Sequence, residues 1–95
     1  MKTVGGIEIA PQRGLTSMPQ PAASAWSFME TNPLAGASYV PLVYVGSQVT
    51  KGIEYWFIAE QTIVLEEPER HIVKMAIAKF NGEYSLVPNS IERIF

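Results

Sequence analysis

The spacing of apolar residues predicts one helix in the first third of the chain. The apolar positions that recur at intervals of three and four residues are Ala22, Ala25, Trp26 and Met29. Pro21 suits a first helical turn, where a missing N–H costs little, and Gln20 or Ser17 could cap the helix. Asn32-Pro33 end it, because proline disfavours helical geometry in the residue before it. The sequence therefore predicts a short helix with Trp26 as the anchor of the core.

The remaining apolar segments have the pattern of β-strands. The segments rich in β-branched and aromatic side chains are residues 39–46, 53–65, 71–80 and 83–94. Within the second of these, the odd positions are expected to form the apolar face: Ile53, Tyr55, Phe57, Ala59, Ile63 and Leu65. The even positions, Trp56 among them, are mixed and predict a wetter face. Near the start of the chain, Ile7 and Ile9 could add a short strand to one edge of the sheet.

Turn signals separate these segments. Gln48–Gly52 reads as the tip of a first hairpin, and residues 66–70 read as a charged turn. Asn81-Gly82 predicts a tight second hairpin, because both residues tolerate the positive φ of a type I′ turn. Pro88 lacks a donor for the sheet and favours an edge or a bulge, and a bulge is expected at Pro41 as well.

The order of short strand, helix and four consecutive antiparallel strands predicts an α+β fold. A single helix would pack on a four- to five-stranded antiparallel sheet, with residues 1–95 forming one domain. The net charge of −2 and the lack of a basic stripe argue against a nucleic-acid partner. No apolar run could span a bilayer, so no membrane partner is expected. Without a signal pattern, the chain is expected in the cytoplasm, or outside the cell if it is a processed form.

Few residues are available for catalysis. The chain has no cysteine and no aspartate, and His71 is its one histidine. Disulfides, thiolate nucleophiles and thiolate metal sites are therefore excluded, and no metal or cofactor is expected. His71 is expected as a surface residue at the start of a strand. These residues argue against an enzyme, although a small α+β hydrolase remains an alternative.

The first hairpin tip carries the strongest candidate for a contact. Gln48, Val49, Thr50, Lys51 and Gly52 are expected to protrude from a rigid sheet, where side chains are free to bind a partner. In this order of elements the chain resembles the cystatin family, whose first hairpin carries a Gln-Val-Val-Ala-Gly pattern matched here at the first, second and last positions. Tyr55-Trp56-Phe57 is similar to the family's third strand, and the lack of cysteines is closer to the stefin type.

The resemblance implies a reversible inhibitor of papain-like cysteine peptidases. Its wedge would consist of the N-terminal segment at Gly5-Gly6, the first hairpin and the second hairpin at Asn81-Gly82. Thr50 and Lys51 depart from the pattern, and the lysine brings a charge that must be paired or desolvated in an apolar cleft. The second hairpin also lacks the Pro-Trp of many secreted members.

The same fold could serve another purpose. A cystatin-fold interaction or assembly module without inhibitory activity would use an exposed sheet edge or the face of Trp56 for self-association.

Overall fold

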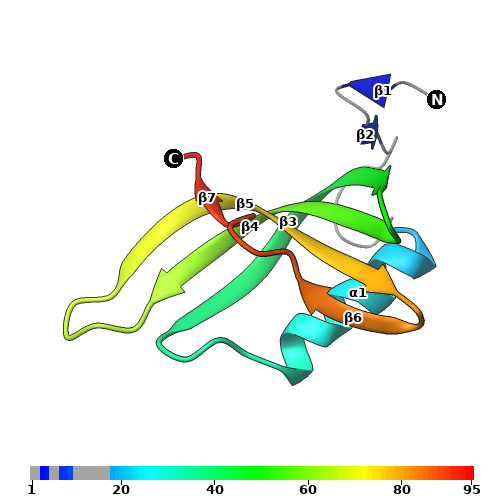
Figure 1. Cartoon of the computed structure of the whole chain (residues 1–95). Coiled ribbons are helices and arrows are strands. Elements are labelled where there is room, and N and C mark those ends of the chain that lie inside the picture. Colours follow the sequence, from blue (N-terminus) through cyan, green and yellow to red (C-terminus); the bar gives the residue numbers. More distant parts are fainter. Residues whose placement is uncertain (1–2, 5–6, 10–17) are drawn as a thin grey trace.

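The computed structural model describes residues 3–4, 7–9 and 18–95. In these residues a single helix lies across one face of an antiparallel sheet (Figure 1). The elements in chain order are β1 (Thr3–Val4), β2 (Ile7–Ile9), α1 (Gln20–Thr31), β3 (Ala37–Val49), β4 (Ile53–Ile63), β5 (Glu69–Phe80), β6 (Glu83–Leu86) and β7 (Glu92–Arg93). The predicted α+β class is confirmed.

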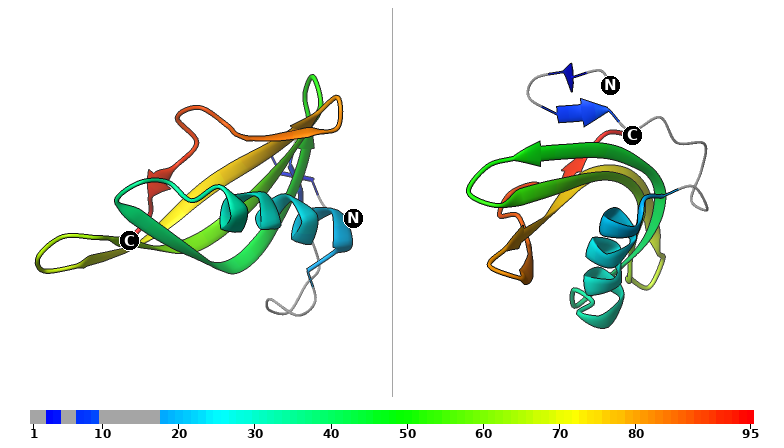
Figure 2. Two further views of the ribbon diagram at one scale, coloured as in Figure 1. Left: turned by 90° about the horizontal axis from the view of Figure 1, so that it is seen from below. Right: turned by 90° about the vertical axis from the view of Figure 1, so that its right-hand side faces the viewer.

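The described strands form one sheet in the order β1-β2-β3-β4-β5-β6, and β7 also pairs with β5. Every pairing is antiparallel. The three long central strands curve around α1 and leave the other face of the sheet turned outward (Figure 2). The short strand predicted at Ile7 and Ile9 is present and pairs with β3, with Glu8 opposite Ser47.

The core lies between the helix and the concave face of the sheet. All four residues of the predicted helical face are buried, and Trp26 is only 3% exposed. Its ring meets Phe57 of β4 edge-on, with 5.1 Å between the ring centroids. The other buried strand residues of this cluster are Tyr44, Tyr55, Ala59, Val73, Met75 and Ile77. Trp26 is thus the core anchor, as predicted.

The two ends of the helix differ in how they are closed. A proline lies in the first turn as expected, but Gln20 begins the helix and no described side chain caps it. Ser17, the other predicted cap, lies outside the described residues. At the other end the backbone N–H of Asn32 donates to the carbonyl of Phe28 at 2.9 Å, and the helix ends there as predicted. No helix in the described part of the chain is long and apolar enough to cross a membrane.

β3 is irregular in two places. The register with β4 shifts between Pro41 and Val43, which confirms the bulge predicted at the proline. A second shift lies between Tyr44 and Gly46. Gly46 then stands opposite Trp56, whose partner on the other side is Ala76. Because both neighbours are small, they leave room for the indole on the convex face of the sheet.

Two predicted strands are wrong in their extent. The segment 83–94 is split into β6 and β7, because Pro88 offers no ladder donor and Asn89 adopts a left-handed φ of 60°. The segment 53–65 ends at Ile63, so Leu65 leaves the apolar face and is exposed.

Candidate functional site

The first hairpin is tighter than its sequence suggests. Gln48 and Val49 still belong to β3, where Val49 stands opposite Ile53. The turn proper is Thr50–Gly52, and the Thr50 N–H donates to the Gly52 carbonyl at 2.9 Å. The expected five-residue tip is therefore a three-residue turn that follows a two-residue strand end, because the ladder continues to the pair Val49 and Ile53.

The second hairpin has the geometry expected of Asn-Gly. Asn81 and Gly82 adopt φ values of 51° and 79°, as a type I′ turn requires. Phe80 and Glu83 form the pair that closes the turn. Both turn residues are exposed, so they are available to a partner.

The two tips lie side by side at one end of the molecule (Figure 2). Ile53, which follows the first tip, stands opposite Lys79, which precedes the second. The N-terminal strand β2 reaches the same end, because it pairs with β3 at Gly46 and Ser47. Gly5 and Gly6 themselves lie outside the described residues. The structure thus brings both predicted hairpins together, with the strands that flank the diglycine beside them.

Gly52 has a packing role that its sequence context does not reveal. A β-carbon added there would lie 3.1 Å from the carbonyl carbon of Lys79 and 3.2 Å from the α-carbon of Phe80, and it would overlap the Lys79 carbonyl oxygen. The first tip can therefore lie against the backbone of β5 only because this residue has no side chain. Gly52 is therefore needed for the close packing of the two hairpins, independently of any contact with a partner.

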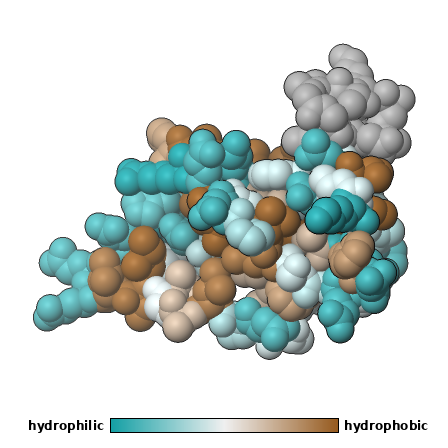
Figure 3. All heavy atoms as spheres, viewed as in Figure 1, coloured by the Kyte–Doolittle hydropathy of each residue, from teal (hydrophilic) through white to brown (hydrophobic). Residues whose placement is uncertain are grey.

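Exposed side chains at this end offer an apolar surface. Val49 is 80% exposed and Phe80 is 52% exposed, although both belong to strands. Lys51 is exposed at the apex and forms no ion pair within the described residues. Sequence reasoning missed Phe80, although an aromatic residue directly before an Asn-Gly turn was a usable signal. At this end of the molecule, hydrophobic and hydrophilic residues alternate on the face seen in Figure 3. A partner bound there would meet small, separate apolar areas.

The side chain of Trp56 is less exposed than self-association through its face would require. Its side chain is half-buried on the convex face, and the Lys74 ammonium lies 5.9 Å from the centre of its ring. Lys74 Nζ is in turn 3.4 Å from a carboxylate oxygen of Glu92. The indole Nε1 is buried and has no hydrogen-bond partner among the described residues. The ring is therefore largely covered by its own neighbours.

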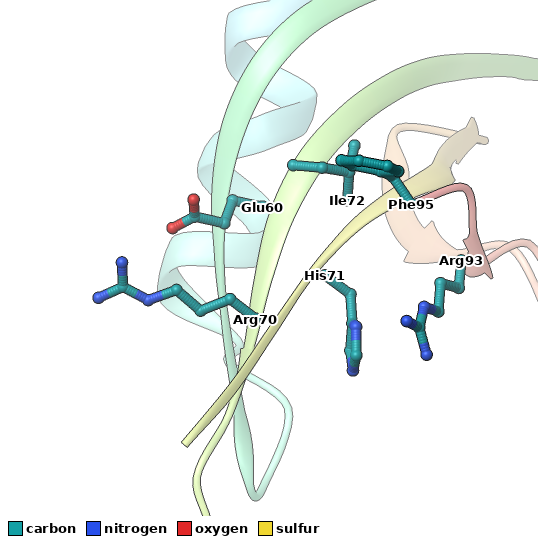
Figure 4. A pocket seen from close by; sticks show the side chains of 6 residues that line it. All are labelled: Glu60, Arg70, His71, Ile72, Arg93 and Phe95. Carbon is teal, nitrogen blue, oxygen red and sulfur yellow. The ribbon is translucent and has the colours of Figure 1, made fainter. Parts of the chain in front are cut away.

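His71 lies away from the tips, near the start of β5. Its side chain is only 14% exposed, which is less than expected for a surface residue, and its Nε2 is 3.5 Å from Glu69 Oε2. It lines a pocket of about 470 Å³ with residues of β4, β5 and the C-terminal segment (Figure 4). No group of three or more histidine or acidic side chains in the described part of the chain could hold a metal ion.

No family model matches this chain, and neither a curated protein nor a solved structure matches it. The α+β fold and the paired hairpin tips are therefore the features on which a functional proposal can rest.

Proposed function

We propose that the chain is a reversible protein inhibitor of papain-like cysteine peptidases. The observation that supports this function is the projection of Thr50–Gly52 and Asn81–Gly82 side by side from one end of a rigid sheet. Two adjacent turns of this kind form a narrow wedge, and the N-terminal strands lie at the same end. The resemblance to cystatins in the order of elements points to the same class of partner.

The wedge suits a substrate cleft for physical reasons. Both turns are held by ladders that run to their last residue pair, so binding would order little additional chain. Burying Val49 in an apolar cleft would contribute about 1.5–3 kcal/mol, since most of its surface is now in water. A turn also presents its peptide bonds in a bent form that differs from an extended substrate. The wedge could therefore occupy the cleft without offering a bond for cleavage.

Lys51 sets a condition on the partner. Its ammonium at the apex would lose water on entering a cleft, and no described residue of this chain compensates it. A suitable peptidase would leave this ammonium at the solvent-exposed rim or meet it with a carboxylate. Where a carboxylate meets it, binding should weaken as the salt concentration rises.

The test is inhibition of papain, followed by binding to papain whose catalytic thiol is blocked. Val49→Asp should weaken inhibition strongly, because it brings an unpaired carboxylate into an apolar contact. Val64→Asp is the matched control, since Val64 is also exposed, at 66%, but lies beyond β4 at the other end of the sheet. Absence of inhibition by the natural chain at micromolar concentration would refute the function.

A second candidate function is an assembly module that self-associates. It is favoured by the exposed apolar side chains Val40, Leu42 and Val43 on β3. In the described residues, β3 pairs along its outer edge only at Gly46 and Ser47. Pro41 and the bulge beside it limit pairing along this edge, which weighs against a long added strand. Sedimentation velocity at high protein concentration decides: a dimer supports assembly, and a strict monomer excludes it.

A further inference from the structure

The turn of the second hairpin contains a chemically reactive pair of residues. Asparagine is a thermolabile residue, and Asn81 is followed directly by Gly82. Both residues are exposed, and a β-carbon added to Gly82 would meet nothing within 4 Å beyond its chain neighbours. They form the loop between β5 and β6, which the pair of Phe80 and Glu83 closes. The Asn81 side chain is therefore open to water and to the backbone that follows it.

The backbone nitrogen of Gly82 is the nucleophile of this pair. Among the described residues, neither its N–H nor the side-chain amide of Asn81 has a hydrogen-bond partner. The nitrogen is close to the side-chain carbonyl carbon of Asn81 along the covalent chain, so attack on that carbon closes a five-membered ring. Gly82 has no side chain to hinder the approach. The pair can therefore cyclise without help from another residue.

We propose that Asn81 is a site of spontaneous deamidation, which converts it to aspartate and isoaspartate. The Gly82 nitrogen attacks the side-chain carbonyl carbon, a C–N bond forms, and the side-chain nitrogen leaves as ammonia with the proton of the Gly82 N–H. Water then adds to one carbonyl of the succinimide ring and breaks the C–N bond beside it. Opening at the side-chain carbonyl gives aspartate. Opening at the backbone carbonyl gives isoaspartate, whose main chain contains one additional carbon atom.

The other two asparagines of the chain each lack a feature that this reaction needs. Asn32 precedes Pro33, whose nitrogen carries no hydrogen. Asn89 precedes Ser90, which is only 7% exposed and whose N–H donates to the Val87 carbonyl at 3.1 Å. The nucleophile is thus absent in the first case and both buried and engaged in the second. The structure therefore favours the asparagine of the hairpin and supplies two internal controls.

Isoaspartate at position 81 would change the second hairpin in two ways. The additional main-chain atom would lengthen the loop between Phe80 and Glu83, so a type I′ turn could no longer close this pair. The new carboxylate would lie near Glu83 and would add one negative charge to a chain that already carries −2. Under the proposed function, an aged chain would lose contacts of this tip with the peptidase. That consequence rests on the proposed function, whereas the conversion itself does not.

The test is incubation of the full chain at mildly alkaline pH, followed by digestion at acidic pH and mass spectrometry of the peptides. Isoaspartate is distinguished from aspartate by methylation with an isoaspartyl methyltransferase. Asn81 should convert at least about tenfold faster than Asn89, because the Ser90 nitrogen must first be freed by local opening. Asn32 should remain unchanged. Equal rates at Asn81 and Asn89 would overturn the proposal.

The same incubation in guanidinium chloride separates the effect of the fold from that of the sequence. Unfolding should accelerate the conversion of Asn89 and should leave the rate at Asn81 within about fivefold of its native value. A greater slowing of Asn81 in the native chain would mean that the turn protects it, and the proposal would fail. Asn81→Gln should abolish the conversion at this position, since glutamine would have to close a larger ring. Unchanged isoaspartate formation in this variant would place the reaction elsewhere and refute the site.

Asn81→Asp isolates the effect of the additional main-chain atom, because it brings the charge alone. In NMR spectra, the amide signals of Phe80 and Glu83 should shift further in the isoaspartate form than in this variant. Equal shifts would show that the turn remains closed and would refute the change in the hairpin. None of these measurements involves a peptidase, so they are independent of the proposed inhibition.

Discussion

The hydroxyl of Ser90 is bonded to both backbone groups of Ala76. Its Oγ accepts a hydrogen bond from the Ala76 N–H at 3.1 Å and donates one to the Ala76 carbonyl at 3.3 Å. The same carbonyl also accepts from the Val87 N–H at 3.0 Å. Between the ladders of β5 with β6 and with β7, the Ala76 N–H has no backbone partner among the described residues, and the hydroxyl of this buried serine accepts its hydrogen bond instead.

Ser90→Ala should therefore destabilise the fold by about 1–3 kcal/mol, the cost of a buried donor left unpaired. The loss comes from the Ala76 N–H, since the carbonyl keeps Val87 as a partner. Urea denaturation measures it, and Ser85→Ala, an exposed serine on β6, is the control. Equal stability of the two variants would show that water replaces the hydroxyl.

Gly52→Ala should destabilise the protein by about 1–3 kcal/mol, the range for overpacking. The added methyl group would overlap the backbone of Lys79 and force the two hairpins apart. Lys51→Ala, one residue earlier in the same turn, should change stability by less than about 0.5 kcal/mol. Thermal unfolding compares the two. A stable Gly52→Ala variant would mean that the first turn yields without disturbing β5.

Trp26→Ala should cost about 3–5 kcal/mol, because it empties the site that packs against Phe57. Trp26→Phe should cost less, about 1–3 kcal/mol, since the buried Nε1 has no described acceptor and no hydrogen bond is lost. Urea denaturation of both variants checks the order. A larger loss in Trp26→Phe than in Trp26→Ala would contradict the packing.

Phe80→Ser should weaken binding to a papain-like peptidase about tenfold, if the second hairpin enters the cleft. Phe80 is exposed beside Asn81-Gly82, so its ring would be the apolar surface that the second hairpin offers to the proposed cleft. Leu65→Ser is a matched control, because Leu65 and Phe80 are both 52% exposed. Leu65 follows the end of β4, in the loop at the opposite end of the sheet from the hairpin tips. Surface plasmon resonance with thiol-blocked papain measures both. Equal affinities would remove the second hairpin from the interface.

Much of the fold followed from local patterns. The apolar positions from Ala22 to Met29 share a helical face because helix geometry repeats every 3.6 residues or so, and that face is buried. Asn81-Gly82 and Pro41 carry their backbone constraints within one or two residues, so the turn and the bulge were predictable as well. The positions of both hairpin turns were likewise recognisable from their glycine and polar residues.

Other features depend on contacts between residues far apart in the chain. Gly52 looks like an ordinary turn residue until the register sets it against Lys79 and Phe80. Pro88 predicted an irregularity in the last strand. The contact between Ser90 and Ala76, however, depends on the path of the last residues along β5.

The sequence by itself determined that one helix precedes a series of strands joined by two hairpin turns, although not where each strand ends, because backbone preferences and periodicity act over a few residues. The tertiary structure decided which turns share one end, why Gly52 must lack a side chain, and how His71 comes to line a pocket with the C-terminal residues. These depend on strand register and on the curvature of the sheet, which arise from packing of the whole chain around Trp26 and Phe57.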